Sequence, residues 1–213
     1  MGGVYLVTSP RRPVSALLAI VEAALEGGVS LVQLRDKGAY TDAEREDAAR
    51  GIADLCGSHD APFLVNDDPQ LARRLRADGV HVGRADPSPR IARSLLGPKA
   101  IVGVTVYGKT GEEERAEREG ADYLAIGPFF PSPTKPEAPE LPLHVLDAVV
   151  ARTRLPVFAI GGIDIDRARI LARHRVAGIA VVSAIMDAPD PRKVAAELRR
   201  AFEEARPRPV TGP

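Results

Sequence analysis

Short apolar runs alternate with longer amphipathic segments along almost the whole chain. The apolar runs are rich in β-branched residues and begin at Val4, Leu31, Phe63, Gly79, Ile101, Tyr123, Val157 and Ile179. Between them, the segment 14–26 carries its leucines and a valine on one helical stripe, and the segment 42–55 is also amphipathic. Strands that alternate with helices in this way indicate repeated βα units around a parallel sheet. Eight units predict an α/β fold, a single-domain (β/α)8 TIM barrel with eight parallel strands.

The predicted helix starts separate residues that have a structural task from residues that have none. Thr41 followed by Glu44 predicts a capping box before the second helix. Three further helices should start where a capping side chain precedes proline, at Asp68-Pro69, Ser88-Pro89 and Asp190-Pro191. Asn66, Asp67 and Asp86 lie between a strand end and a cap and have no evident structural task.

Composition limits the classes of protein to consider. The 213 residues suffice for one domain; we expect 1–205 to form the barrel and the Pro-rich segment 206–213 to be a disordered tail. The chain is 45% hydrophobic and 27% charged with zero net charge, which is typical of a soluble globular protein and gives no reason to expect nucleic acid as a partner. Short apolar runs, no signal-peptide pattern and the lone Cys56 predict a cytoplasmic protein without a membrane partner. The oligomeric state stays open, with a homo-oligomer as one alternative.

In a barrel of this kind, polar residues at the C-terminal strand ends face the functional site. The second strand runs into Gln33, Arg35 and Lys37, which the period of two places on one side. Two cations and an amide at the barrel mouth suit a diphosphate. A solvated strand end with a flexible loop is the alternative.

The third and fourth strands run into two carboxylates, Asp67 and Asp86, the first preceded by Asn66. Paired oxygen ligands that leave open positions fit Mg2+ shared between the protein and phosphate oxygens. His81 lies inside the fourth strand, where we expect it to line the pocket or the core instead of acting as a base.

Two later segments predict further phosphate contacts. The long loop after the sixth strand reaches Ser132, Thr134 and Lys135 and is a candidate lid, with an ordinary exposed loop as the alternative. The seventh strand ends in Gly161-Gly162 and the eighth in Val182-Ser183. Glycines allow close approach of backbone N–H groups, and barrels commonly bind phosphate after these two strands.

Seven segments together resemble the thiamine phosphate synthase family over nearly the whole chain, in the right order. They are VQLRDK, FLVNDDPQLA, ADGVHVGRADP, GVTV, GADYLAIGPFFPSPTK, AIGGI and VVSAI. The resemblance implies a transferase of thiamine biosynthesis that joins hydroxymethylpyrimidine diphosphate to a (carboxy)thiazole phosphate. It also implies a dissociative reaction with Mg2+, in which diphosphate leaves and the thiazole nitrogen captures the pyrimidine methylene.

The same resemblance assigns roles to individual residues. It implies a diphosphate clamp of Arg35, Lys37, Lys135 and Asn66, with Thr105 beside the departing diphosphate. It implies Mg2+ ligands at Asp67 and Asp86. It implies a pyrimidine side formed by Gln33, His81 and Gly83. It implies a thiazole phosphate side formed by Ser132, Thr134, Gly161, Gly162, Val182 and Ser183.

Several positions depart from the family pattern. Thr105 stands where serine is usual, and Ser132 stands where threonine is usual. The segment 136–146 lacks the usual glycine-containing connection, and the first strand ends in Thr8-Ser9 instead of the frequent Thr-Asp.

Two other functions compete with the synthase. A thiazole tautomerase on the same barrel would need a histidine near Pro128, and proline cannot transfer a proton. A non-catalytic sensor of phosphate ligands is the second alternative, because a fold alone does not fix function. The sensor is disfavoured by the joint presence of the predicted metal ligands and cations, which are Asp67, Asp86, Arg35, Lys37 and Lys135.

Overall fold

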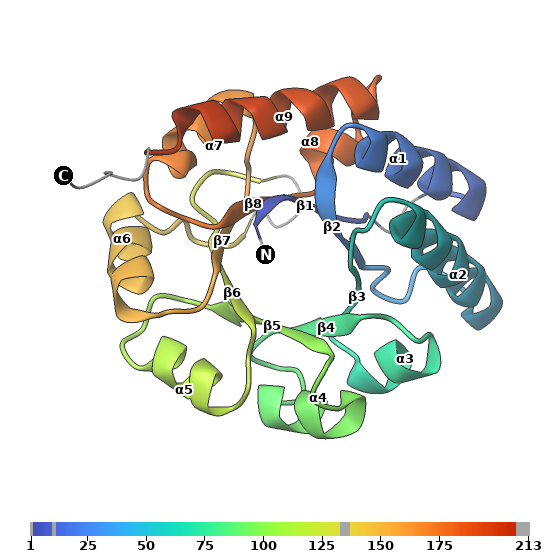
Figure 1. The fold of residues 1–213 in the computed structure, drawn as a ribbon, viewed down its shortest axis with the longest axis horizontal. Helices are drawn as coiled ribbons and strands as arrows, with labels where there is room; N and C mark the ends of the chain where they lie inside the picture. Colours follow the sequence, from blue (N-terminus) through green and yellow to red (C-terminus); the bar gives the residue numbers. More distant parts are fainter. Residues whose placement is uncertain (1, 10–11, 133–136, 208–213) are drawn as a thin grey trace.

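The computed structural model is a closed eight-stranded parallel barrel surrounded by helices, and it describes residues 2–9, 12–132 and 137–207. Figure 1 looks along the barrel, with the strands as the inner ring and the helices outside. The strands are β1 (Gly3–Val7), β2 (Val29–Leu34), β3 (Phe63–Asn66), β4 (Gly79–Val82), β5 (Ile101–Val106), β6 (Tyr123–Ile126), β7 (Val157–Ile160) and β8 (Gly178–Val181). The predicted fold class is therefore confirmed.

The helices follow the strands in turn. They are α1 (Val14–Glu26), α2 (Asp42–Ser58), α3 (Pro69–Arg74), α4 (Pro89–Leu96), α5 (Glu112–Arg118), α6 (Leu143–Arg152), α7 (Ile165–Ala172), α8 (Ser183–Met186) and α9 (Pro191–Ala205). The short α8, which the sequence pattern did not predict as a separate element, lies between β8 and α9. Of the expected disordered tail, residues 208–213 lie outside the described part of the chain.

The helix caps that the sequence predicts are present. Thr41 and Glu44 form a capping box at the start of α2. The side chains of Asp68, Ser88 and Asp190 accept backbone N–H bonds at the starts of α3, α4 and α9. These side chains are therefore used to stabilise helix termini.

The barrel closes where β1 pairs with β8 as well as with β2. Strand residues that point outward pack under the helices, and Val4, Leu6, Val32 and Leu34 belong to this larger core. Residues that point inward form a second, smaller core of Tyr5, Val7, Leu31, Leu64, Tyr123, Phe158 and Ala180. The branched and aromatic residues of each strand are thus divided by the period of two between the two cores.

Three aromatic rings fill the middle of the barrel. The ring centroid of Tyr123 lies 6.0 Å from that of Tyr5 and 5.3 Å from that of Phe158. Small residues on neighbouring strands make the room: a Cβ atom on Gly178 would lie 2.4 Å from Cε1 of Phe158. The aromatic rings form a packed floor below the C-terminal strand ends.

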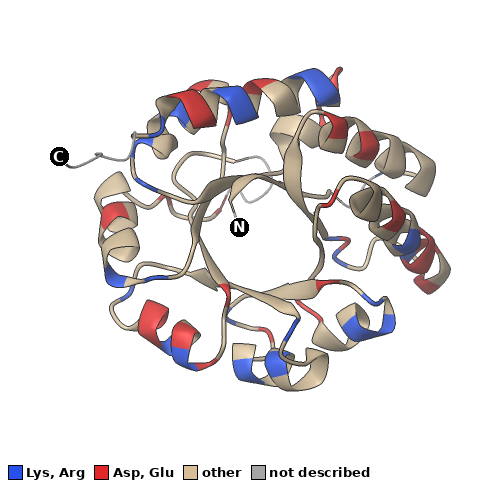
Figure 2. Ribbon diagram, in the orientation of Figure 1, with Lys and Arg blue, Asp and Glu red and all other residues tan. Residues whose placement is uncertain are grey.

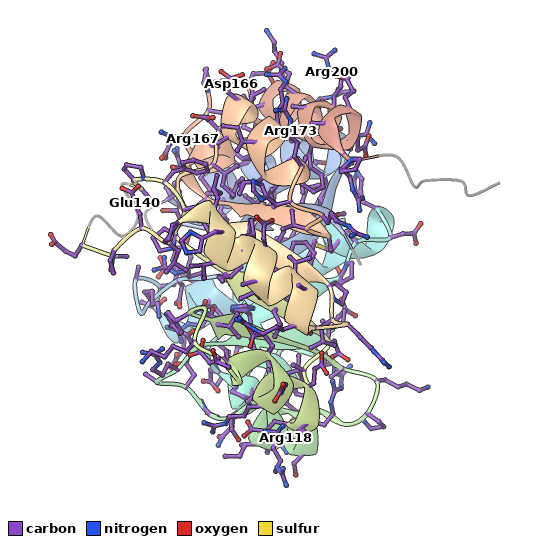
Figure 3. The ribbon with its side chains drawn as sticks, turned by 90° about the vertical axis from the view of Figure 1, so that its left-hand side faces the viewer. Arg118, Glu140, Asp166, Arg167, Arg173 and Arg200 are labelled. Atoms are coloured by element: carbon purple, nitrogen blue, oxygen red, sulfur yellow. The ribbon has the colours of Figure 1, made fainter. Side chains whose placement is uncertain are left out.

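Charged residues of both signs are distributed over the outer helices, while the strands that line the barrel are almost free of them (Figure 2). In the side view of Figure 3, α6 crosses the middle, and labelled charged residues such as Arg118 and Arg200 lie at the periphery. Glu140, in the connection between β6 and α6, marks the side on which the strands end. Within the described residues, no helix combines the length and the apolar character that a membrane crossing needs.

Candidate active site

A cavity of about 320 Å³ opens at the C-terminal ends of the strands. It brings together every described residue that the sequence singled out for the site. These are Gln33, Arg35, Lys37, Asn66, Asp67, His81, Gly83, Asp86, Thr105, Ser132, Gly161, Gly162, Val182 and Ser183. The remaining two, Thr134 and Lys135, lie outside the described residues.

Arg35 follows the last residue of β2 and is half-buried in the cavity wall. Its backbone is fixed to the end of β1, because the Arg35 N–H donates to Thr8 Oγ1 at 2.9 Å. Burial lowers the pKa of the Arg35 guanidinium, against the charge of Asp67, which raises it. The Asp67 carboxylate itself forms an ion pair with Lys37. A half-buried cation in this situation favours an anionic ligand.

Lys37 reaches the same wall from the loop after β2, and its ammonium donates to Asp67 Oδ2 at 2.5 Å. Both residues have left-handed backbone conformations, with φ of 49° at Lys37 and 67° at Asp67. Such values are uncommon outside glycine and are often found at functional sites. The Asp67 N–H donates to the His81 carbonyl at 2.7 Å, which fixes the end of β3 to β4.

The two carboxylates lie within hydrogen-bonding reach of each other. Burial raises the pKa of Asp86 above its ordinary value, and the neighbouring Asp67 adds to this effect. Burial also acts to raise the pKa of Asp67, but the hydrogen bond and the charge of Lys37 hold it below the ordinary value. Asp86 is oriented by the Gly83 N–H, which donates to its Oδ2 at 2.7 Å. Two adjacent carboxylates with opposite shifts favour a bound cation or proton between them.

The donor set around these carboxylates fits a magnesium ion. Asp67 and Asp86 supply hard oxygen atoms from neighbouring strand ends, and magnesium bound this way usually completes its shell with water and substrate phosphates. Within the described residues, no three His, Cys, Asp or Glu side chains gather in a metal-binding arrangement. The carboxylate pair would therefore leave most coordination positions to substrate oxygen atoms and water.

The cavity floor is a continuous chain of hydrogen bonds. Gln33 Nε2 donates to the Tyr5 hydroxyl at 2.6 Å, and the hydroxyls of Tyr5 and Tyr123 are 3.0 Å apart. His81 Nδ1 is 2.8 Å from the Tyr123 hydroxyl, and its Nε2 is 2.8 Å from Thr105 Oγ1. The sequence reasoning missed both tyrosines. Their inward position on a strand, where a buried hydroxyl needs a partner, is the signal that could have found them.

Gly161 and Gly162 face the loop that follows β6. Their φ angles are 103° and 64°, and a Cβ atom on Gly162 would lie 2.3 Å from the Pro131 carbonyl oxygen. A Cβ atom on Gly161 would lie 2.4 Å from Cβ of Pro128. Both positions therefore require glycine for packing as well as for conformation. This packing sets the loop that carries Ser132 against the end of β7.

The residues after β8 that the sequence predicts as phosphate contacts lie at the start of α8. Val182 and Ser183 both line the cavity, and the first intrahelical bonds run from Ile185 and Met186 back to the Val182 carbonyl. The N–H groups of Ser183 and Ala184 precede these bonds and are available to a ligand.

Two further residues at the rim were not predicted. The Arg84 guanidinium lies 4.1 Å from the centroid of the Tyr107 ring and pairs with Glu112 at 3.3 Å. Arg84 and Tyr107 both line the cavity.

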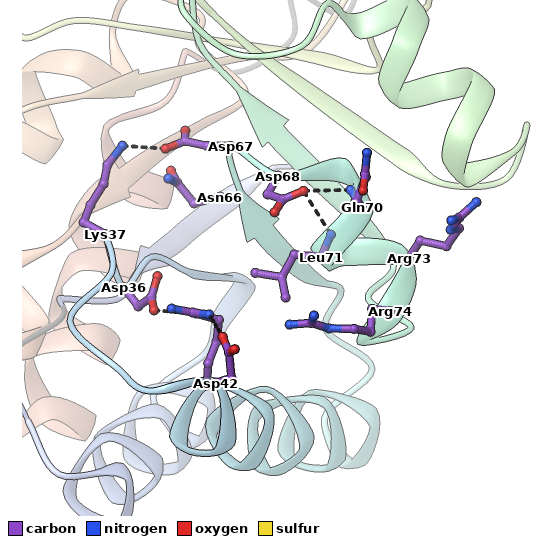
Figure 4. A pocket seen from close by; sticks show the side chains of 11 residues that line it. Asp36, Lys37, Asp42, Asn66, Asp67, Asp68, Gln70, Leu71, Arg73 and Arg74 are labelled. Carbon is purple, nitrogen blue, oxygen red and sulfur yellow. Dashed lines mark hydrogen bonds and ion pairs between the residues drawn. The ribbon is translucent and has the colours of Figure 1, made fainter.

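An open hollow of about 830 Å³ adjoins the cavity on the side of α2 and α3 (Figure 4). The two spaces share Lys37, Asn66 and Asp67 in their walls. Beyond them, Arg45 pairs with Asp36 and Asp42 at 2.7 Å each, which ties the loop carrying Lys37 to α2. The hollow mixes both signs of charge, and the strand-end cavity is the stronger candidate for an active site.

The chain matches known proteins over nearly its whole length. The family model described as thiamine monophosphate synthase matches residues 4–185. The thiamine-phosphate synthase of Thiobacillus denitrificans is 46% identical over 201 residues, which cover 94% of this chain and 95% of that protein. The thiamine-phosphate synthase of Thermoplasma acidophilum is 42% identical, with 94% and 92% covered.

A solved structure is similar in fold as well. Thiamine phosphate pyrophosphorylase from Pyrococcus furiosus superposes with a TM-score of 0.84 at 36% identity, covering 95% of this chain and 96% of that one. Sequence and fold therefore indicate the same family.

Proposed function

The chain belongs to the thiamine monophosphate synthase family and is a transferase with thiamine-phosphate synthase activity, and from this premise we propose how the cavity is divided between its ligands. The substrates are hydroxymethylpyrimidine diphosphate and a thiazole phosphate, and the metal is Mg2+. The observation that carries the proposal is the half-buried guanidinium of Arg35, which lines the same cavity as the carboxylates of Asp67 and Asp86.

The diphosphate binds between β2 and β5. Arg35 and Lys37 supply positive charge from the β2 side, and Asn66 supplies an amide donor from β3. Thr105 lies at the β5 side of the same cavity with its hydroxyl near His81. Lys135, which lies outside the described residues, would complete the clamp when the loop after β6 covers the site.

Asp67 and Asp86 are the residues that would hold Mg2+ beside the diphosphate. The metal supplies positive charge that favours departure of the diphosphate. The Lys37 ammonium donates a hydrogen bond to Asp67 Oδ2, and it would be able to turn toward the diphosphate if Asp67 bound a cation.

The pyrimidine ring lies on the floor, against Gln33, His81 and Gly83. The second substrate places its phosphate at the opposite wall, near Gly161, Gly162, Val182 and Ser183, with Ser132 and Thr134 closing from the loop. This division puts the reacting carbon between two anion-binding regions that are formed by separate strand ends.

In this reaction, the residues of the cavity need to stabilise the negative charge that develops on the departing diphosphate. The carbon–oxygen bond of the pyrimidine diphosphate breaks, the electron pair leaves with the diphosphate, and the thiazole nitrogen forms the new carbon–nitrogen bond. Cations preorganised around the departing group are the largest contribution that the protein can make. Each ring nitrogen of His81 lies 2.8 Å from a hydroxyl, that of Tyr123 or that of Thr105, in agreement with a binding role instead of a base. A covering loop would keep water from the reactive pyrimidine cation.

The proposed compartment is the cytoplasm. Cys56 is the only cysteine of the chain, and burial raises the pKa of its thiol to about 12. A buried, protonated thiol without a partner for a disulfide fits a reducing compartment.

The test is a stoichiometric assay with both substrates and Mg2+. We expect one diphosphate for each thiamine phosphate. Aromatisation of a non-aromatic thiazole tautomer without diphosphate release would instead support the tautomerase, although Pro128 lies in the cavity wall where that activity needs a proton carrier. Binding without turnover would support a sensor.

A matched pair of variants tests the clamp. Arg35→Gln should weaken inhibition by inorganic diphosphate by about tenfold or more, because charged hydrogen bonds to an anion contribute about 1.5–3 kcal/mol. Arg74→Gln is the control, since Arg74 lines only the adjoining hollow and pairs with Glu46 at 3.6 Å. Equal effects of the two substitutions would contradict the proposed diphosphate position.

A further inference from the structure

The hydrogen bonds of the cavity floor have a direction. A side-chain amide nitrogen can only donate, so Gln33 Nε2 gives its proton to the Tyr5 hydroxyl oxygen. Tyr5 is 1% exposed, and among the described residues its hydroxyl lies within hydrogen-bonding distance of Gln33 and Tyr123. Its own proton therefore has one place to go, the oxygen of Tyr123.

The same reasoning continues across the barrel. Tyr123 has accepted from Tyr5, so its proton points at His81 Nδ1, which must accept. The reverse order would make Tyr5 accept from both neighbours and leave its own proton buried without an acceptor, at a considerable cost in free energy. Both hydroxyls stay protonated, because burial raises the pKa of Tyr5 and Tyr123 above the ordinary value.

We propose that Tyr5 and Tyr123 are positioning residues that transmit the hydrogen-bond direction set by Gln33 to His81. They fix this histidine as its Nε2–H tautomer, and this tautomer makes Thr105 a hydrogen-bond donor toward the ligand. His81 Nε2–H then donates to Thr105 Oγ1 at 2.8 Å, and the Thr105 hydroxyl proton is directed to another acceptor. One end of the chain presents the Gln33 carbonyl oxygen as an acceptor, and the other end presents a donor.

This order has a consequence for specificity at the two ends. Thr105 and Gln33 both line the cavity, on β5 and β2. A donor at Thr105 matches an anionic oxygen, and an acceptor at Gln33 matches an amino group of a ring. This consequence rests on the proposed function, whereas the tautomer of His81 can be measured without any substrate.

The first experiment measures the tautomer. The chain has four histidines, and a long-range ¹H–¹⁵N spectrum of the ¹⁵N-histidine-labelled protein distinguishes Nε2–H from Nδ1–H rings. At about pH 8.5, roughly two units above the ordinary histidine pKa, exposed rings are neutral. The His81 signals are identified by their loss in a His81→Asn variant.

We expect His81 to be an Nε2–H ring in the unmodified protein and a mixture of both tautomers in Tyr123→Phe. Tyr40→Phe is the control, because Tyr40 is a buried tyrosine whose hydroxyl donates to the Arg12 carbonyl at 2.7 Å, outside the chain of bonds. It should leave the His81 signals unchanged. An Nδ1–H ring in the unmodified protein, or an unchanged ring in Tyr123→Phe, would overturn the inference.

The second experiment asks whether Tyr123 acts through Thr105. Tyr123→Phe and Thr105→Val should each lower kcat by about tenfold, with a smaller change in KM, if the donor acts mainly on charge that develops in the transition state. The double variant should be no slower than Thr105→Val alone. Multiplicative effects would overturn the coupling. If Thr105→Val does not change kcat, the role of Thr105 in the proposed function fails, and the inference is then decided by the spectrum alone.

Discussion

A Cβ atom on Gly103 would lie 2.1 Å from Cζ of Tyr123, so the tyrosine ring occupies the space that any side chain at residue 103 would need. Gly103 belongs to β5 and Tyr123 to β6, and the two residues are register partners. The same Cβ atom would lie 2.3 Å from the Tyr123 hydroxyl. Glycine is therefore needed at residue 103 for the Tyr123 hydroxyl to occupy its buried position beside His81.

Gly103→Ala should damage both stability and turnover. Overpacking of a close-packed interior typically costs about 1–3 kcal/mol, and displacement of the ring should break the bond between Tyr123 and His81. Denaturant unfolding and steady-state kinetics measure the two effects. Gly57→Ala in α2 is the control, because its Cβ would meet nothing within 4 Å, and it should be neutral or stabilising. Unchanged unfolding of Gly103→Ala would show that the ring has room to move.

The barrel could be predicted from the sequence because the strands and the helix caps depend on residues that are close together in the chain. Runs such as those at Phe63 and Gly79 begin where the strands begin, and Asp68 caps its helix as its place before proline indicates. These features depend on residues a few positions apart, which a single sequence displays directly.

The sequence predicted which residues line the candidate site, but it did not predict the contacts between them. The period of two explains Gln33, but β2 ends at Leu34, so Arg35 and Lys37 reach the cavity through the loop and not by strand alternation. The contact between Tyr5 and Tyr123, 118 residues apart, depends on barrel closure, and so does the contact between Lys37 and Asp67 from neighbouring strand ends. Such contacts are long-range, and no local pattern encodes them.

The two floor tyrosines should make the protein sensitive to alkali. Burial raises the pKa of both hydroxyls, so the folded state keeps these protons at a pH where the unfolded chain releases them. Their contribution is therefore fully present below about pH 10, the ordinary tyrosine pKa, and is lost as pH rises through the raised value. The loss should be about 1.4 kcal/mol per pH unit for each tyrosine.

This expectation can be checked by measuring the unfolding free energy of the unmodified protein, Tyr5→Phe and Tyr123→Phe between about pH 9 and pH 11. This range extends about one unit on either side of the ordinary tyrosine pKa. Each substitution should make the unfolding free energy fall less steeply with rising pH, by the amount that one tyrosine contributes. Three parallel curves would mean that the hydroxyls ionise equally easily in both states.

Glu113 should be the most sensitive charged position of the outer shell. Its side chain is fully buried, and Oε1 accepts from Arg152 Nη2 at 2.6 Å, whereas Oε2 has no hydrogen-bond partner within the described part of the chain. Arg152→Gln leaves a buried carboxylate without its cation and should cost about 3–5 kcal/mol in unfolding free energy.

The neighbouring pair on the same helix is the control. Glu114 and Arg118 are 3.9 Å apart and well exposed, so Arg118→Gln should cost about 0–1 kcal/mol. Because Oε2 of Glu113 is unsatisfied, replacing Glu113 and Arg152 together by leucine and methionine should recover much of the loss. Equal costs for the two arginine substitutions would mean that the buried carboxylate is solvated or protonated in the folded state.

Asp67 and Asp86 should act as one unit through a shared Mg2+, which a double-mutant cycle can show. Asparagine is the suitable replacement, because it tolerates the left-handed conformation of Asp67, with its φ of 67°, and preserves the shape of both side chains. Each single substitution should cost about a hundredfold or more in rate and raise the Mg2+ concentration required, since misplaced electrostatic stabilisation typically costs several kcal/mol.

Asp68→Asn is the matched control: Asp68 is adjacent in sequence but caps α3, and asparagine caps equally well, so turnover should change by less than about twofold. Once one ligand is lost, the second substitution has little left to remove, and the double variant should be much less damaged than the product of the single effects. Strictly multiplicative losses, or an unchanged Mg2+ requirement in both single variants, would show that the two carboxylates do not share a metal, and their closeness would then reflect a shared proton instead.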